Sequence, residues 1–208
     1  NAFLATKISF ANAMSIICEK TGANVKKVME GMGVDSRIGK LFLNAGLGYG
    51  GSCLPKDISA FVALSSGIGY DFSLLKSVEK INNDQILIFV SKIIKGLGFK
   101  PNQNLGGVKL ALLGLAFKPN TDDIREAPSL KVIKALLDKG AKITAYDPEA
   151  VENTREIFPE INYAKDVYDA AKDADALIII TEWPEFREMD LERIRKNLKK
   201  SIIIDGRN

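Results

Sequence analysis

The chain has 208 residues, a formal net charge of +3 and no histidine. Its length allows one large or two small domains with proper cores. The charge is too mild and too scattered for a nucleic-acid-binding protein, although it suits an anionic small molecule. Without histidine, neither a histidine-dependent triad nor a histidine-dependent metal site can form, and we expect no metal centre.

The two cysteines, Cys18 and Cys53, do not suggest a disulfide framework. Such cysteine usage predicts a protein of the reducing cytoplasm. The apolar first segment is interrupted by polar residues, is short for a membrane span and lacks the flanks of a signal peptide, so we expect no membrane association. Both ends of the chain fall beside apolar runs, and we interpret the sequence as a piece of a longer protein.

Helical periodicity dominates the first half of the chain. It predicts helices over residues 1–21, 24–31, 35–43, 55–67 and 73–96. Gly22 is a natural end for the first helix, and Asn24 is a natural cap for the second. The first helix is apolar nearly all round, which predicts that it is buried, either in a core or between subunits.

The helical periodicity stops near residue 99, where prolines, asparagines and glycines indicate a linker. Beyond it, expected strands alternate with expected helices, over 108–113, 128–139, 142–146, 166–171, 176–180, 191–198 and 201–204. This alternation predicts a parallel α/β sheet with helices on both faces. We therefore expect a helical domain (1–98), a linker (99–106) and an α/β domain (107–208).

The segment from Gly46 to Asp57 carries the strongest chemical signal in the first half. A glycine-rich loop leads to Cys53, and Pro55, Lys56 and Asp57 follow at once. If a helix starts here, Cys53 and Asp57 stand one turn apart on one face. The unpaired N–H groups at the helix start would favour the thiolate, as covalent catalysis on a carbonyl requires. The alternative is an inert cysteine that behaves as a small buried hydrophobe.

A long loop follows the first expected strand of the second half, from Gly114 to Pro128. It is not G-x-G-x-x-G, so this half should not be a standard dinucleotide site. Phe117 could stack on a base, and Lys118 could meet a phosphate. From charge alone, the simpler interpretation is a solvated charged loop.

Two stretches resemble signatures of the nucleotide-sugar 6-dehydrogenases, the UDP-glucose/GDP-mannose dehydrogenase family. One is Gly48-Tyr49-Gly50-Gly51-Ser52-Cys53-Leu54-Pro55-Lys56-Asp57; the other is Gly-x-Ala-Phe-Lys-x-x-Thr-x-Asp-x-Arg, from Gly114 to Arg125. The resemblance implies an α-helical central dimerisation domain followed by a Rossmann-like UDP-binding domain, and a homodimer through the first helix. The family's N-terminal NAD domain has no counterpart in these residues.

The same resemblance implies NAD-dependent oxidation of the C6 alcohol of a UDP-sugar to a carboxylate. Cys53 matches the nucleophile, Asp57 an aspartate that helps activate water, and Asn1 an asparagine that holds the C6 oxygen. Lys56 and Arg125 match cofactor contacts. The positions that match substrate contacts are Arg37, Phe42, Leu43, Gly48, Tyr49, Phe117, Lys118 and Arg207, with Arg37 reaching the neighbouring subunit's substrate.

Several functions remain open at this point. The sequence Gly48-Tyr49-Gly50-Gly51 favours UDP-glucose as the substrate over GDP-mannose, and UDP-N-acetyl sugars come third. A non-catalytic binding and dimerisation module is the alternative from another class. A free-standing Rossmann-like nucleotide binder leaves the helical half and Cys53 without a role. Lacking the NAD domain, the 208 residues alone should bind NAD poorly and turn over negligibly.

Overall fold

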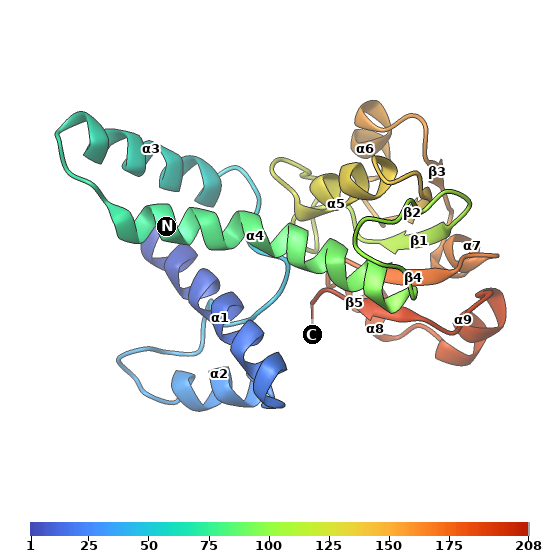
Figure 1. The fold of residues 1–208 in the computed structure, drawn as a ribbon, viewed down its shortest axis with the longest axis horizontal. Coiled ribbons are helices and arrows are strands. Elements are labelled where there is room, and N and C mark those ends of the chain that lie inside the picture. Colours follow the sequence, from blue (N-terminus) through green and yellow to red (C-terminus); the bar gives the residue numbers. More distant parts are fainter. Residues whose placement is uncertain (208) are drawn as a thin grey trace. The chain divides into compact units, whose positions relative to one another are not determined.

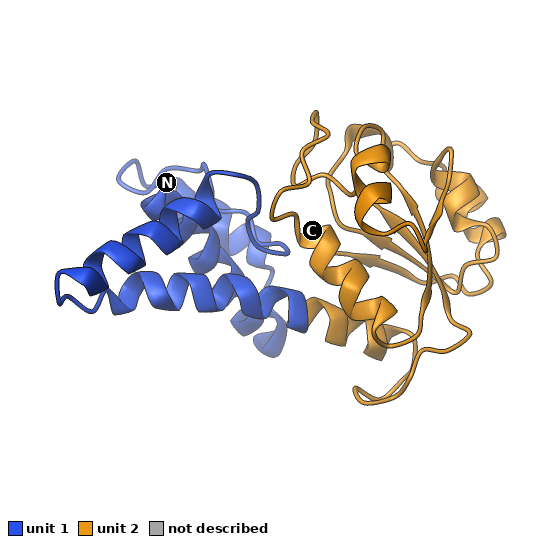
Figure 2. Cartoon of the chain, turned by 90° about the horizontal axis from the view of Figure 1, so that it is seen from above, with its two compact units in different colours: residues 1–87, 208 blue, residues 88–207 orange. Residues whose placement is uncertain are grey.

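The computed structural model describes residues 1–207. Residue contacts divide the chain into a helical unit, Asn1–Leu87, and a sheet unit, Ile88–Arg207 (Figure 2). The helix that joins them contributes its first part to one unit and its last two turns to the other. The expected domain limits, at residues 98 and 107, stay a prediction, because the contacts define compact units and do not test where the domains end.

The helical unit contains four helices, and the last of them continues into the sheet unit (Figure 1). Their bounds are α1 (Ala2–Thr21), α2 (Val25–Gly33), α3 (Leu54–Gly67) and α4 (Ser73–Gly96). Gly22 ends α1 in the left-handed conformation, with φ 75°. The Asn24 side chain caps α2 by accepting a hydrogen bond from the Lys27 amide at 3.1 Å. These features confirm the sequence-based expectation for the four helices.

The expected helix over residues 35–43 is wrong, because this segment is a series of turns. The Asp35 carboxylate accepts a hydrogen bond from the Arg37 amide at 2.9 Å, which is a local alternative to helical bonding. Gly39 and Phe42 then take left-handed conformations, with φ 71° and 63°. A helix cannot pass through such residues.

Helix α1 is only partly buried within this chain. Ala5, Ala11 and Cys18 face the interior, whereas Phe3 and Ile17 are 73% and 53% exposed. Phe10 lies midway between those two and is also exposed. Burial of this face between subunits stays a prediction.

The sheet unit is built on five parallel strands in the order β3-β2-β1-β4-β5. Its elements are β1 (Lys109–Leu113), α5 (Pro128–Leu137), β2 (Lys142–Tyr146), α6 (Val151–Ile157), β3 (Asn162–Tyr163), α7 (Val167–Ala171), β4 (Ala176–Ile179), α8 (Pro184–Arg187), α9 (Leu191–Asn197) and β5 (Ile203–Asp205). Figure 1 shows α5 and α6 on one side of the sheet and α8 and α9 on the other. The expected doubly covered parallel sheet is confirmed.

Strand β1 lies at the centre of the sheet and explains why both faces are covered. Successive side chains of a strand point to opposite faces. Ala111 and Leu113 pack in a cluster with Trp183, Phe186 and residues of α7 and α9. The alternate residues of β1 are also fully buried, so the strand reads as a continuous apolar run.

Three short elements were not expected from the sequence: α6, β3 and α8. Strand β3 has two residues and α8 has four, which is too short for periodicity to reveal.

Within residues 1–207, no helix combines the length and the apolar character needed to cross a membrane.

Candidate functional site

Cys53 lies at the N-cap position of α3, directly after the glycine loop. Its carbonyl accepts the first helical hydrogen bond, from the Asp57 amide at 3.0 Å, so the two residues are one turn apart. The side chain is exposed, and its sulfur lies 3.6 Å from the Ser52 hydroxyl. Cys18, in contrast, is buried within α1. The accessible thiol is therefore the one that the glycine-rich motif carries.

The Asp57 carboxylate interacts with two other expected site residues, Asn1 and Lys56. The Asn1 amide donates a hydrogen bond to Asp57 Oδ2 at 2.5 Å, and Lys56 Nζ lies 3.4 Å from Asp57 Oδ1. The Asn1 amide, and to a lesser extent the Lys56 ammonium, hold the pKa of the Asp57 carboxyl below its usual range. The carboxylate is thus ionised at neutral pH. An amide nitrogen carries two N–H donors, so Asn1 retains one for another oxygen.

The expected substrate-contact residues between α2 and α3 differ in how exposed their side chains are. Leu43 and Tyr49 are buried, Leu43 with Ala11 and Met29, so their side chains are covered within this chain. Burial raises the pKa of Tyr49 to about 12, so the phenol stays protonated well above neutral pH. Phe42, in contrast, is exposed at the surface.

Arg37 is exposed and makes a bidentate ion pair with Asp35, with its Nη2 atom 2.6 Å from Asp35 Oδ2. This pair raises the pKa of Arg37 and lowers that of Asp35. An incoming anion would have to compete with Asp35 for the guanidinium. The turn itself is fastened by Lys7 of α1, whose ammonium donates to the Ile38 carbonyl at 2.9 Å.

Two buried asparagines hold the main chain of the glycine loop, and sequence patterns did not identify either. Asn12 of α1 accepts a hydrogen bond from the Gly46 amide at 2.8 Å. Asn82 of α4 accepts one from the Tyr49 amide at 2.8 Å and donates one to the Tyr49 carbonyl at 3.2 Å. Each partner is more than thirty positions away along the chain. A single sequence carries no local signal for such long-range contacts.

In the sheet unit, the expected residues lie on loops that follow the carboxyl ends of the strands. This edge is where parallel sheets bind ligands. Lys118 Nζ lies 5.4 Å from the centre of the Phe117 ring, in cation–π geometry. Arg125 donates to both oxygens of Asp123, and this pairing holds the pKa of Asp123 below its usual range. The loop after β1 therefore presents an aromatic ring and an ammonium together.

Arg207 follows β5 at the same edge of the sheet. Its guanidinium pairs with Glu182, which follows β4, with N–O distances of 2.5 and 2.8 Å. Both side chains are half-buried, since about a quarter to a third of each is exposed. The pair therefore ties the ends of two neighbouring strands, β4 and β5, to one another.

Asp147, directly after β2, is buried, and the sequence predicts for it only the end of a strand. It accepts hydrogen bonds from the amides of Leu115, Ala116, Glu149 and Ala150 and from the Trp183 indole, at 2.6 to 3.1 Å. A carboxylate with so many charge-assisted bonds is a strong structural anchor. It fixes the main chain immediately before Phe117.

The geometry of this loop does not fit the pyrophosphate of NAD. In a dinucleotide-binding fold, glycine amides after the first strand face the phosphates at a helix N-terminus. Here the Leu115 and Ala116 amides donate to Asp147, and the Gly114 amide donates to the Tyr146 carbonyl at 2.9 Å. Helix α5 begins only at Pro128, after a long loop. The amides that would face a pyrophosphate are thus bonded within the sheet unit, and the expectation that this half is not a standard dinucleotide site stays a prediction.

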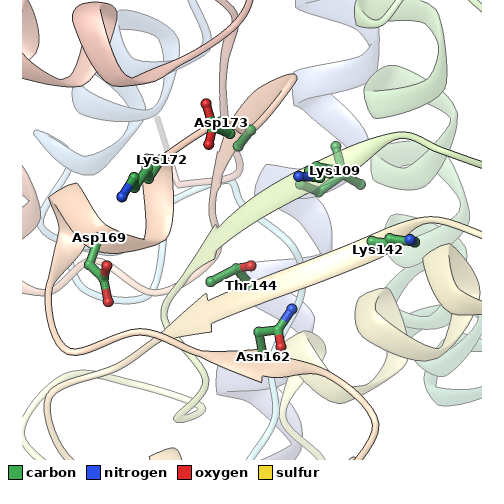
Figure 3. Close-up of a pocket in the computed structure, with 9 residues that line it drawn as sticks. Lys109, Lys142, Thr144, Asn162, Asp169, Lys172 and Asp173 are labelled. Atoms are coloured by element: carbon green, nitrogen blue, oxygen red, sulfur yellow. The ribbon is translucent and has the colours of Figure 1, made fainter.

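One hollow of about 200 Å³ lies at the opposite, amino edge of the sheet (Figure 3). It is lined by the starts of β1 and β2, by β3 and by the turn after α7. Lys142 and Lys172 lie on opposite sides of it, and Asp169 and Asp173 offset part of the positive charge. None of the expected site residues lines this hollow, so it is separate from the candidate site. Among residues 1–207, no group of three or more potential ligands is arranged to hold a metal.

Comparison with known proteins accounts for both units. The central-domain model of the UDP-glucose/GDP-mannose dehydrogenase family matches residues 1–84, and the family's UDP-binding-domain model matches residues 111–208. The chain is 47% identical to UDP-glucose 6-dehydrogenase TuaD of Bacillus subtilis and 46% identical to UDP-glucose 6-dehydrogenase of Rhizobium meliloti. All of this chain is covered in both cases, but only 44% and 47% of those relatives.

Among solved structures, a UDP-glucose dehydrogenase from Pyrobaculum islandicum superposes with a TM-score of 0.91 at 35% identity. It is matched over the whole of this chain and over 46% of its own length. The chain thus spans about half the length of the relatives it matches. The two family models together cover most of the chain, and it belongs to the UDP-glucose/GDP-mannose dehydrogenase family.

Proposed function

We propose that the protein to which this chain belongs oxidises the C6 alcohol of UDP-glucose to the carboxylate of UDP-glucuronate, with NAD⁺ as the hydride acceptor. The observation that carries the proposal is the exposed Cys53 at the start of α3, one turn from an ionised Asp57 that Asn1 and Lys56 hold in place. The names of the relatives support UDP-glucose as the substrate.

The cysteine supplies the covalent chemistry. After the alcohol has lost a proton and a hydride, the Cys53 thiolate adds to the aldehyde carbon, and the carbonyl oxygen takes up a proton to give a thiohemiacetal. Loss of that proton and of the C6 hydride leaves a thioester. Water then attacks, the C–S bond breaks, and the carboxylate and the free thiolate are released. Covalent attachment prevents loss of the aldehyde between the two oxidations.

Asp57 and Asn1 are proposed to act on the oxygens around C6. The ionised Asp57 can accept a proton from water as the water attacks the thioester. The second N–H of the Asn1 amide can hold the C6 oxygen as negative charge develops on it. Lys56 stabilises the carboxylate form of Asp57 and is proposed to lie near the cofactor.

The nucleotide half of the substrate is assigned to the other expected residues. Phe117 offers a face for the uracil, and the Lys118 ammonium offers a charge for the diphosphate. Arg207 and Arg37 are proposed to meet the substrate, residues 42, 43, 48 and 49 to line its site, and Arg125 to meet the cofactor. The pyrophosphate of NAD is assigned to a part of the protein outside these residues, and a homodimer through α1 is part of the same proposal.

The test uses the full-length protein, with absorbance at 340 nm to follow NADH. With UDP-glucose, we expect two NADH for each sugar oxidised, and the Cys53→Ser variant should lose at least about a thousandfold in kcat because it lacks the nucleophile. Cys18→Ser is the matched control and should retain activity, since Cys18 is buried within α1 and does not belong to the segment that carries Cys53.

The choice of substrate decides between the open alternatives. Turnover of GDP-mannose or of a UDP-N-acetyl sugar in preference to UDP-glucose would reassign the substrate within the family. Nucleotide-sugar binding without NADH formation from any of these sugars would favour the non-catalytic module. Full activity of Cys53→Ser would refute the covalent role of this cysteine.

A further inference from the structure

The glycine loop before Cys53 has little intrinsic stiffness. Four of its six residues from Gly46 to Gly51 are glycine, and the loop has no helix or strand of its own. Gly48 and Gly51 take left-handed φ values of 97° and 81°. Glycine-rich segments of this kind have high conformational entropy. Some other part of the molecule must therefore fix the loop if Cys53 is to keep one position.

The main fastening is the Asn82 side chain. Its oxygen accepts from the Tyr49 amide and its nitrogen donates to the Tyr49 carbonyl, so one side-chain amide satisfies both polar groups of a single residue. Asn82 is only 8% exposed, which makes these bonds costly to lose. A Cβ on Gly48 would lie 2.5 Å from Asn82 Oδ1, so the glycine is what lets the main chain approach.

We call this pair of Asn82–Tyr49 hydrogen bonds the clamp, and two further contacts lie next to it. Asn12 of α1 holds the Gly46 amide, three residues upstream of Tyr49. The Tyr49 ring packs in a buried cluster with Ala5, Ile58 and Leu75. Ile58 belongs to α3, the helix that Cys53 starts, so the same cluster ties the loop to the helix. The path from Tyr49 to Cys53 is only four residues long, and both of its ends are therefore held.

From these contacts we infer that Asn82 is a positioning residue for Cys53: its amide fixes the main chain of the glycine loop and thereby the place of the thiol. The inference rests on the proposed function for its catalytic consequence. It does not assign Asn82 any contact with the substrate. A misplacement of about 1 Å at a reacting group can cost a hundredfold in rate, so a loosened loop should lower kcat.

The test compares Asn82→Asp with wild type by hydrogen exchange and by kinetics in the full-length protein. The new carboxyl still accepts from the Tyr49 amide, but when ionised it can no longer donate to the Tyr49 carbonyl. At pH 8 we expect the amides of residues 46–52 to exchange at least about tenfold faster than in wild type. We expect kcat to fall by about tenfold or more.

The pH dependence of loop exchange in Asn82→Asp tests whether restoring the lost donor restores the loop. A protonated carboxyl can donate again, so the ratio of loop exchange in Asn82→Asp to that in wild type should return towards one as the pH falls. Gln85→Met is the matched control, because Gln85 is buried one turn along α4 and its Nε2 has no hydrogen-bond partner. This control should leave loop exchange and kcat unchanged.

The outcomes separate the clamp from the chemistry. Unchanged loop exchange in Asn82→Asp would overturn the inference, as would faster exchange with an unchanged kcat. If Asn82→Asp lowers the stability of the whole helical unit, exchange in α1 and α3 rises with that in the loop, and a local clamp is refuted. If wild type itself forms no NADH, the proposed function fails, and loop exchange alone decides whether Asn82 fixes the loop.

Discussion

At the scale of single residues, Asp57 shows how a local hydrogen bond sets a protonation state. Its carboxyl pKa is lowered first by the Asn1 amide and then by Lys56. In a titration of the 208-residue chain followed by NMR, Asn1→Ala should raise the pKa of Asp57 towards its ordinary value, and Lys56→Gln should raise it less. Lys80→Gln, which removes a partner of Asp84 on α4, is the control and should leave Asp57 unchanged.

The sign of the pH dependence follows from this shift. Because the folded-state pKa of Asp57 lies below the unfolded value, its contribution to stability is present above the unfolded pKa and is lost as the pH falls through the folded pKa. The loss should therefore occur in the acidic range and not near neutrality. A stability contribution from Asp57 that appeared only on acidification would contradict the assignment.

Gly48 provides the second test at this scale. Its φ of 97° disfavours any side chain, and a Cβ would approach Asn82 Oδ1 to 2.5 Å. Gly48→Ala should therefore lower the free energy of unfolding by about 1–3 kcal/mol, as measured by urea unfolding with circular dichroism. Gly31→Ala is the matched change, because Gly31 lies in α2 with open space around it, and it should stabilise by about 0.5–1 kcal/mol. Equal effects of the two substitutions would contradict the strain at Gly48.

At the scale of elements, Asp147 joins β2 to the loops after β1 and β4 through three N–H donors, those of Leu115, Ala116 and Trp183, and it accepts two more from its own loop. Asp147→Asn keeps the shape but turns an N–H group towards these donors, so we expect a loss of about 2–4 kcal/mol in unfolding free energy. Trp183 is the only tryptophan and bonds to Asp147, so its fluorescence reports on this unit in urea unfolding. Asp138→Asn, which removes an exposed ion pair with Lys134, is the control and should change stability by less than about 0.5 kcal/mol.

The elements also show what sequence patterns can and cannot predict. The long helices and central strands were predictable because α4 carries a sustained helical period and β1 is a short, continuous apolar run. The segment after α2 was not, since Asp35 competes for backbone hydrogen bonds and Phe42 adopts a positive φ that only the folded surroundings select. Elements of two to four residues, such as β3 and α8, are too short to show a period.

The candidate site was predictable only where its residues are neighbours in the sequence. Cys53, Lys56 and Asp57 stand within one helical turn, so their proximity followed from the helix itself. The hydrogen bond from Asn1 to Asp57 was not anticipated from the residues, because it spans 56 positions. The same holds for the buried Asn82 and Asp147, whose roles depend on tertiary contacts that composition and periodicity do not encode.

At the scale of the whole molecule, the proposed function divides the chemistry between the two units. In that proposal the helical unit supplies the thiol and the carboxylate, and the sheet unit supplies the aromatic ring and the cations that meet the nucleotide. The amides after β1, which would bind a pyrophosphate in a dinucleotide fold, are committed to Asp147 and Tyr146. The 208-residue chain should therefore bind a UDP-sugar but not NAD.

Isothermal titration of the 208-residue chain tests this division. We expect measurable heat with UDP-glucose, no saturable heat with NAD, and no NADH when both are present, whereas the full-length protein should form NADH. Lys118→Gln should weaken UDP-glucose binding by about three- to tenfold, because it removes one cation from the proposed diphosphate contacts. Lys131 lies on α5 and forms an exposed ion pair with Glu126, and Lys131→Gln should leave the affinity for UDP-glucose unchanged. Saturable NAD binding or NADH formation by the chain alone would show that these residues hold a cofactor site that the β1 loop does not reveal.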